Sequence, residues 1–406
     1  MRNILLIIIV FLLSQFNMAI AGKAVKFGNV DWTFSGSMRL EMAYMFKNLG
    51  DQLDYGERNT FILETPGNSW LRTTAKLNKI TAVAEIGLYF DEHRYVRHAY
   101  LTYDIDEYNQ LTAGKTWTLL AEVGPYSFAG YFMGLWGVGD LFSFRHDQLQ
   151  YAHTNKRFQF KIAIEDQKKE EGEEFLRDNH DPTSGLESEY TTEDHVPSLL
   201  GSFSLFLPGF RITPSFLLQT YKLTPIERYK DEVDDITINT YAFAINSEFK
   251  YKAFSILCEA WFGQNIDVHT GESNMSEHND YPMQRIGATT YMGKPYANET
   301  RDDIVDLHTF GGYLQFGINI NKKNMIHIGG GYQQANTKKK GPYFEKDVSV
   351  YGTYLNYTFI VNKSCLIIPG IAFYDWGKDV NKNAFGLNKN DLGSDVFVGV
   401  FMMHNF

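Results

Sequence analysis

The feature that most constrains the fold of this chain is the spacing of the connections between its strand-like segments. Short joints alternate with long ones along most of the chain, and the last apolar segment ends on Phe406. Outer-membrane barrels have tight turns at one rim and long loops at the other, whereas a soluble sandwich has no reason to keep this alternation. The pattern therefore predicts an all-β, antiparallel barrel that spans a membrane.

The amino terminus has the pattern of a secretory signal. A positively charged start is followed by an apolar run over residues 4–13 and by the small-residue cleavage pattern Ala19-Ile20-Ala21. The run is too short for a membrane helix, which needs about 20 residues. We expect residues 1–21 to be a signal peptide and residues 22–406 to form one barrel domain, because no Pro/Ser-rich linker divides them.

Composition excludes several classes of protein. Beyond the signal no apolar stretch reaches the length of a membrane helix and the mean hydropathy is negative, so a helical membrane protein is excluded. The net charge of −10 argues against a general nucleic-acid binder. Cys258 and Cys365 are far apart on separate predicted strands, so a disulfide framework is not supported. The aromatic content of 15% suits the girdles of a barrel.

The strands themselves are predicted from period-two alternation. From Asp31 to Phe46, apolar residues such as Trp32, Phe34 and Met42 share one parity, and polar residues hold most of the other. About 9 to 11 residues at a strong tilt span a bilayer, and this segment is long enough. The same criterion predicts sixteen strands in all, the others at 69–77, 80–90, 94–103, 110–118, 144–152, 157–165, 197–206, 210–221, 237–249, 254–264, 307–320, 325–335, 347–360, 365–375 and 395–406.

Closure of the barrel is expected on physical grounds. A sheet edge in hydrocarbon leaves N–H and C=O groups unpaired, at several kcal/mol each, so the last strand must pair with the first. One face of the last strand suits contact with lipid, although His404 interrupts it; its residues are Val396, Val398, Val400, Met402 and Phe406.

Polar residues on the parity opposite the apolar face are the candidates for the pore lining. A charge facing lipid near the midplane costs roughly 2 to 4 kcal/mol, so we expect these groups to face water inside the barrel. Two interpretations stay open: a scatter of charges such as any water-filled barrel contains, or a mainly cationic lining that favours small anions. The candidates are Arg39, Arg72, Lys76, Glu85, Lys115, Lys161 and Arg211, together with Glu41 and Glu259.

The long connection over residues 119–143 differs from the others because it is mainly apolar and rich in glycine. A loop that is only solvated should be polar, so we expect this segment to fold inward and narrow the channel. A subunit contact or a cap over the rim is the alternative. The residues predicted to form this constriction loop are Glu122, Phe128, Phe132, Trp136 and Asp140.

Three motifs around that segment resemble a known family. Leu-Thr-Ala-Gly-Lys-Thr-Trp at 111–117, Arg-His-Asp-Gln-Leu-Gln-Tyr at 145–151 and Arg-His-Ala-Tyr at 97–100 are similar to segments of the DcaP-like porins. The resemblance implies a trimeric diffusion channel for small, often anionic or dicarboxylate solutes, with cationic residues at the narrowing. Lys115 departs from the Gln of the family and adds charge. The residues before the first strand are too few for the amino-terminal coiled coil of some members.

These observations predict an outer-membrane porin, a passive diffusion channel for small hydrophilic and preferentially anionic solutes. We expect a homotrimer in contact with outer-membrane lipids, without nucleic acid, cofactor, metal site or enzymatic activity. One alternative is an adhesin or receptor that binds through long loops such as 265–306. Another is a barrel hydrolase, for which the nearest candidates are His146, His153, Ser143 and Asn155, although no single strand face presents them together.

Overall fold

The computed structural model describes residues 24–48, 59–65, 69–88, 96–120, 134–135, 138–141, 145–166, 190–193, 196–225, 235–266, 296–297, 304–337, 347–375 and 393–406. The predicted signal, residues 1–21, lies outside them, so its removal stays a prediction. No helix among the described residues is long and apolar enough to cross a membrane.

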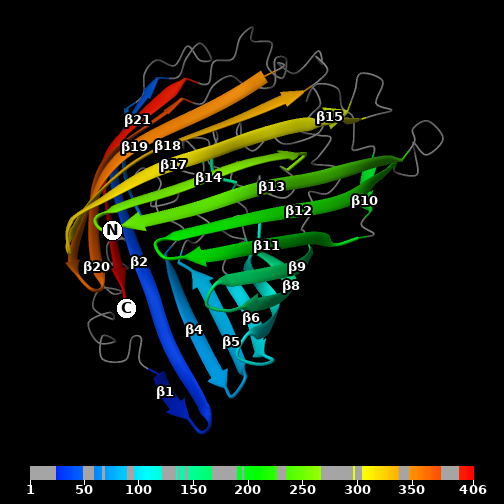
Figure 1. The fold of residues 1–406 in the computed structure, drawn as a ribbon. Helices are drawn as coiled ribbons and strands as arrows, with labels where there is room; N and C mark the ends of the chain where they lie inside the picture. Colours follow the sequence, from blue (N-terminus) through cyan, green and yellow to red (C-terminus); the bar gives the residue numbers. More distant parts are fainter. Residues whose placement is uncertain are drawn as a thin grey trace.

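Sixteen of the described strands close into an antiparallel barrel (Figure 1). Each predicted strand is present, and most ends differ from the prediction by only a few residues. In ring order the strands are β2 (Val30–Asn48), β4 (Trp70–Leu77), β5 (Ile80–Gly87), β6 (Val96–Asp104), β7 (Asn109–Trp117), β8 (Arg145–Thr154), β9 (Phe158–Asp166), β11 (Ser198–Leu207), β12 (Phe210–Pro225), β13 (Ile236–Tyr251), β14 (Phe254–Gln264), β17 (Leu307–Asn321), β18 (Asn324–Thr337), β19 (Asp347–Asn362), β20 (Cys365–Asp375) and β21 (Ser394–Asn405).

Five shorter strands complete the described secondary structure. β1 (Ala24–Phe27), β3 (Asn59–Glu64) and β10 (Tyr190–Glu193) pair with β2 or β12 and extend the sheet. β15 (Tyr296–Ala297) and β16 (Ile304–Val305) pair with each other in a separate small sheet.

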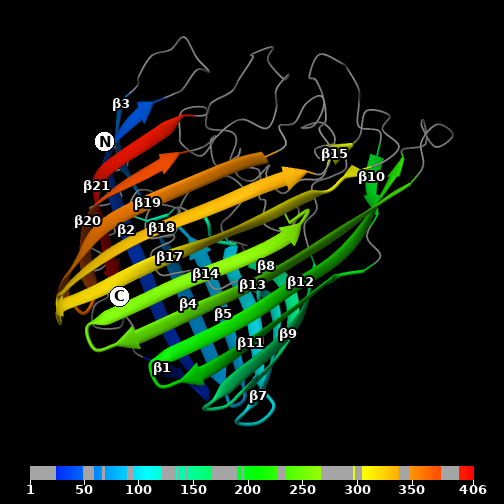
Figure 2. The same ribbon diagram turned by 45° about the horizontal axis from the view of Figure 1, so that its top comes forward.

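The tight turns have the backbone that two-residue hairpins require. Asn78, Lys252 and Gly209 have positive φ angles of 52°, 53° and 72°, in the region that matches the twist of the flanking strands. In the turn after β6, Asp106 accepts hydrogen bonds from the side chain and N–H of Asn109 and from the N–H of Tyr108. These bonds, the Asn109 side chain first, lower the pKa of the exposed Asp106 carboxyl. Figure 2 shows the turns at the lower rim of the barrel.

The barrel closes where β21 pairs with β2. The N–H of Phe406 donates to the carbonyl of Gly36 at 3.0 Å, and the N–H of Gly36 donates back at 2.9 Å. A Cβ on Gly36 would lie 2.4 Å from the Phe406 ring, so the ring occupies the space that glycine leaves. The carboxy-terminal aromatic residue is therefore packed into the seam where the barrel closes. The hydrogen bonds there pair the backbone N–H and C=O groups that would be costly to leave unpaired in lipid.

Gly36→Val should weaken this seam. The new side chain overlaps the Phe406 ring, and overpacking of this kind costs about 1–3 kcal/mol. Urea unfolding of the detergent-refolded protein measures the loss. The double variant Gly36→Val with Phe406→Leu should recover part of it, because the smaller partner makes room. Equal unfolding midpoints for Gly36→Val and wild type would contradict the packing of this seam.

The two faces of the sheet differ as the alternation predicted. On β2, Phe34, Tyr44 and Phe46 point outward and are between 41% and 47% exposed, whereas Glu41 and Met45 are buried on the inner face. The outer face carries exposed apolar side chains on every strand of the barrel. An apolar band of this extent is typical of a surface in contact with acyl chains.

Candidate functional site

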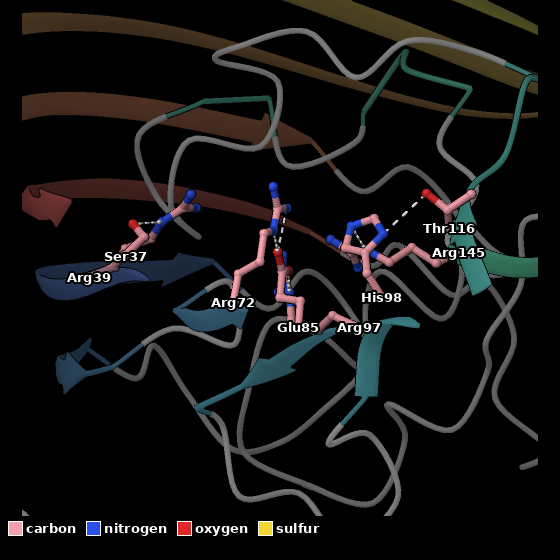
Figure 3. Close-up of polar contacts among 8 residues, drawn as sticks. All are labelled: Ser37, Arg39, Arg72, Glu85, Arg97, His98, Thr116 and Arg145. Carbon is pink, nitrogen blue, oxygen red and sulfur yellow. Dashed lines mark hydrogen bonds and ion pairs between the residues drawn. The ribbon is translucent and has the colours of Figure 1, made fainter. Parts of the chain in front are cut away.

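Four arginines gather on the inner face of the strands from β2 to β8 (Figure 3). They are Arg39 of β2, Arg72 of β4, Arg97 of β6 and Arg145 of β8. Arg145 is the first residue of β8 and has the parity of the exposed Leu149, but its side chain reaches the buried His98 and so joins the cluster. With Glu85 of β5 they form a cluster that we call the arginine wall. Its formal charge is +3, four guanidinium groups less one carboxylate.

Glu85 holds two of these arginines in place. Its carboxylate accepts a hydrogen bond from Arg72 Nε at 2.8 Å and another from Arg97 Nε at 2.7 Å. The Glu85 side chain is 1% exposed, while that of Arg72 is 35% exposed. A register shift between Glu85 and Ile86 is what brings Arg97 beside the carboxylate. Glu85 therefore orients both guanidinium groups, and Arg72 keeps an accessible edge.

The other two arginines are positioned by neutral groups. Arg145 Nε donates to His98 Nε2 at 3.0 Å, and its guanidinium lies 3.7 Å from the centre of the Trp117 ring. Because Nε2 accepts that bond, the His98 proton is on Nδ1, which contacts Thr116 Oγ1 at 3.2 Å. Arg39 Nε donates to Ser37 Oγ at 3.3 Å. These contacts, all with uncharged groups, fix the positions of the two guanidinium groups.

The other predicted pore-lining residues lie outside this cluster, with Glu41 beside Arg39 on the same face of β2. The strand register places Lys76, Lys161 and Arg211 on the inner face, and Arg211 lies 3.7 Å from Glu248 close to the turn between β11 and β12. Glu41 and Glu259 are also on the inner face, 1% and 3% exposed.

Lys115 is a correction, because the register does not support it as a pore-lining residue. It is paired with Ala99 and Asp147 and shares the parity of the exposed Leu111. In a strand with period two, Lys115 therefore lies on the outer face of β7. The charge that departs from the family pattern is not placed inside the barrel.

The described parts of the 119–143 segment contact the opposite inner wall. The N–H of Leu141 donates to Glu259 Oε1 at 2.7 Å, and Trp261 Nε1 donates to the carbonyl of Gly139 at 2.9 Å. Asp140, between them, is 5% exposed. Of the other predicted constriction residues, Glu122, Phe128, Phe132 and Trp136 lie outside the described residues.

Apolar packing supports the same placement. Leu120 and Leu141 belong to a buried cluster with the inward residues Leu200, Leu217 and Trp261. The inner face of strands β9 to β14 thus carries an apolar cluster that the described part of the segment covers, beside buried polar residues such as Glu165 and Glu259, whereas β2 to β8 present the arginine wall. The apolar cluster and the arginine wall therefore lie on different strands of the barrel.

Solved structures share this architecture. The outer membrane channel DcaP of Acinetobacter baumannii superposes with a TM-score of 0.63 at 14% identity, over 95% of this chain and 100% of that chain. The fold is that of the outer-membrane porins. An anion-selective porin from Comamonas acidovorans matches with a TM-score of 0.55 at 10% identity, over 93% of this chain and 100% of that chain. OmpT of Vibrio cholerae, an outer membrane protein, matches with a TM-score of 0.54 at 13% identity, over 94% of this chain and 99% of that chain. No family model and no curated protein sequence matches the chain.

The likeness to DcaP agrees with the motif resemblance. The motifs 97–100, 111–117 and 145–151 lie on the paired strands β6, β7 and β8, and the last two flank the 119–143 segment. They also contain Arg97, His98 and Arg145, which parity did not single out as site residues. The Arg-His and Arg-x-x-Gln motifs were the available signal for these positions.

Proposed function

We propose that the protein is a porin of the outer membrane, a passive diffusion channel for small hydrophilic solutes that favours anions. The observation that carries the proposal is the arginine wall, a cluster of formal charge +3 on the inner face of a closed barrel whose outer face is apolar. Guanidinium groups present several N–H donors in a fixed plane, which suits carboxylates and phosphates. The mechanism is diffusion along this wall, with no cofactor.

The 119–143 segment acts in this proposal as the constriction. Its described residues are held on the β9 to β14 side and on β18 and β20, so the route for solutes runs between the segment and the arginine wall. A solute there passes close to several positive charges at once, and the field of a cationic constriction raises the local anion concentration.

A homotrimer and a non-enzymatic role complete the proposal. One similar solved structure of OmpT is described as a trimer form, which is a property of that protein and the support for a trimer here. His146 and His153, the nearest candidates for a hydrolase, are seven positions apart on β8, an odd offset, and so lie on opposite faces. His153 contacts Asn109 beside a tight turn.

Planar-bilayer recording across a salt gradient tests the proposed function. We expect discrete conductance steps and a reversal potential of the sign for anion preference. A preparation that inserts but conducts nothing, and instead binds a partner through its long loops, would support the adhesin or receptor alternative. Ester or peptide hydrolysis by the refolded protein would support the enzyme alternative.

Glu85→Gln should increase anion preference and lower stability. The change raises the charge of the arginine wall from +3 to +4, and the loss of the ionic partner of Arg72 and Arg97 should cost about 1–3 kcal/mol. Reversal potentials and urea midpoints measure the two effects. Glu248→Gln, at the rim near the tight turns, is the matched control and should cost under about 1 kcal/mol. A lowered anion preference in Glu85→Gln would contradict the assigned role.

A further inference from the structure

Three glycines form a row on the inner faces of the neighbouring strands β17, β18 and β19. Gly311 of β17 is paired with Gln333 of β18, two residues beyond Gly331, and Gly331 is paired with Gly352 of β19. Each leaves space that another group fills. A Cβ on Gly311 would lie 2.5 Å from the Trp261 ring, and one on Gly352 would lie 2.9 Å from the Tyr374 ring. The two aromatic rings are therefore seated against the wall.

The middle glycine receives the 119–143 segment itself. A Cβ on Gly331 would lie 2.0 Å from the backbone oxygen of Val138 and 3.3 Å from the Leu135 side chain. On the segment's side, Gly139 has a φ of +81°, and a Cβ there would lie 2.3 Å from the Gly312 oxygen. Backbone thus packs on backbone, which only glycine permits.

Wall side chains bind the polar groups of the segment at the same place. Gln333 Oε1 accepts from the N–H of Gly139 at 3.0 Å, and Trp261 Nε1 donates to the carbonyl of Gly139 at 2.9 Å. Tyr374 donates from its hydroxyl to the carbonyl of Gly134 at 2.5 Å. The rings that the outer glycines seat are therefore the donors that hold the segment.

We propose that Gly331, Trp261, Gln333 and Tyr374 form a dock that fixes residues 134–135 and 138–139 of the 119–143 segment on the wall and thereby sets the width of the pore. The effect on pore width rests on the proposed porin function, whereas the attachment of the segment to the wall does not depend on that function. The four are positioning residues, because they act on solute passage through the segment that they hold.

Gly331→Ala tests the dock with little effect on the strand, since the φ of Gly331 is not in the left-handed region. Carbon and oxygen need more than 2.0 Å, so the segment must move into the pore by on the order of 1 Å. We expect single-channel conductance to fall about twofold, because conduction depends on pore diameter. Gly330→Ala is the matched control: it points outward, its nearest neighbours would lie at 3.6 Å, and conductance should stay at the wild-type value.

The double variant Trp261→Phe with Tyr374→Phe removes two donors and leaves an aromatic ring at each position. Chymotrypsin should cut the aromatic-rich 119–143 segment about tenfold faster than in wild type, since two hydrogen bonds no longer hold it and cleavage follows the open population. This readout needs no channel activity. A wild-type protein that never conducts would overturn the proposed function while the cleavage rates still test the dock. Conductance of Gly331→Ala at or above wild type, or unchanged cleavage in the double variant, would overturn the dock.

Discussion

Reversing two charges of the arginine wall, with Arg39→Glu and Arg145→Glu together, should turn an anion-preferring channel into a cation-preferring one. The formal charge of the cluster changes from +3 to −1, four units lower. Neither side chain bonds Glu85 directly in the contacts described, so the pairs that Glu85 makes with Arg72 and Arg97 are kept. The sign of the reversal potential should invert, most clearly at about 0.1 M salt, where the Debye length is about 10 Å.

The matched control applies the same change of charge elsewhere on the inner face. Lys76→Glu with Arg211→Glu also lowers the charge by four units, at residues near the tight turns. Because its charges are away from the arginine wall, this variant should shift the reversal potential less and keep its sign. Equal shifts in the two double variants would show that total charge, and not the arginine wall, sets ion preference.

Leu217→Asp should release the 119–143 segment from the wall and raise single-channel conductance by about twofold or more. Leu217 is 0% exposed in the cluster with Leu120 and Leu141, and a carboxylate enclosed there without a partner costs several kcal/mol. Moving the segment away restores water to the carboxylate, so release is the lower-energy outcome. The barrel strands themselves keep their backbone pairing.

Leu217→Met is the control for this variant, because volume-conserving apolar exchanges usually cost less than about 1.5 kcal/mol. Its conductance should equal that of wild type. If Leu217→Asp folds, inserts and conducts like wild type, the apolar cluster does not hold the 119–143 segment in place.

The sequence predicted the strands well because the membrane imposes their pattern. Each strand has lipid on one face, so period two runs through nearly its whole length, and the strands from β2 to β21 begin and end close to the predicted residues. The same alternation placed Arg39, Arg72, Glu85, Lys161 and Arg211 on the inner face. Lys115 was wrongly predicted to line the pore, although the alternation along its strand groups it with the outward Leu111.

The alternation of polar and apolar residues did not predict side-chain positions where strand pairing is irregular, or where a strand contacts a segment distant in the sequence. Arg97 reaches Glu85 only through the register shift in β5 and β6, and no alternation in the sequence reveals an extra residue of that kind. The inward leucines of β11 and β12 break the alternation, since Leu200 and Leu217 are apolar on the face expected to be polar. They mark the wall that the 119–143 segment covers.

The sequence by itself determined the strands, their two faces and the closing seam, because lipid contact and backbone hydrogen bonding act on every strand locally. Only the tertiary structure decided which inward charges meet and where the described parts of the 119–143 segment lie. Those outcomes depend on contacts between residues far apart in the chain, such as Gly331 with Val138, and the geometry that joins them exists only once the barrel has closed.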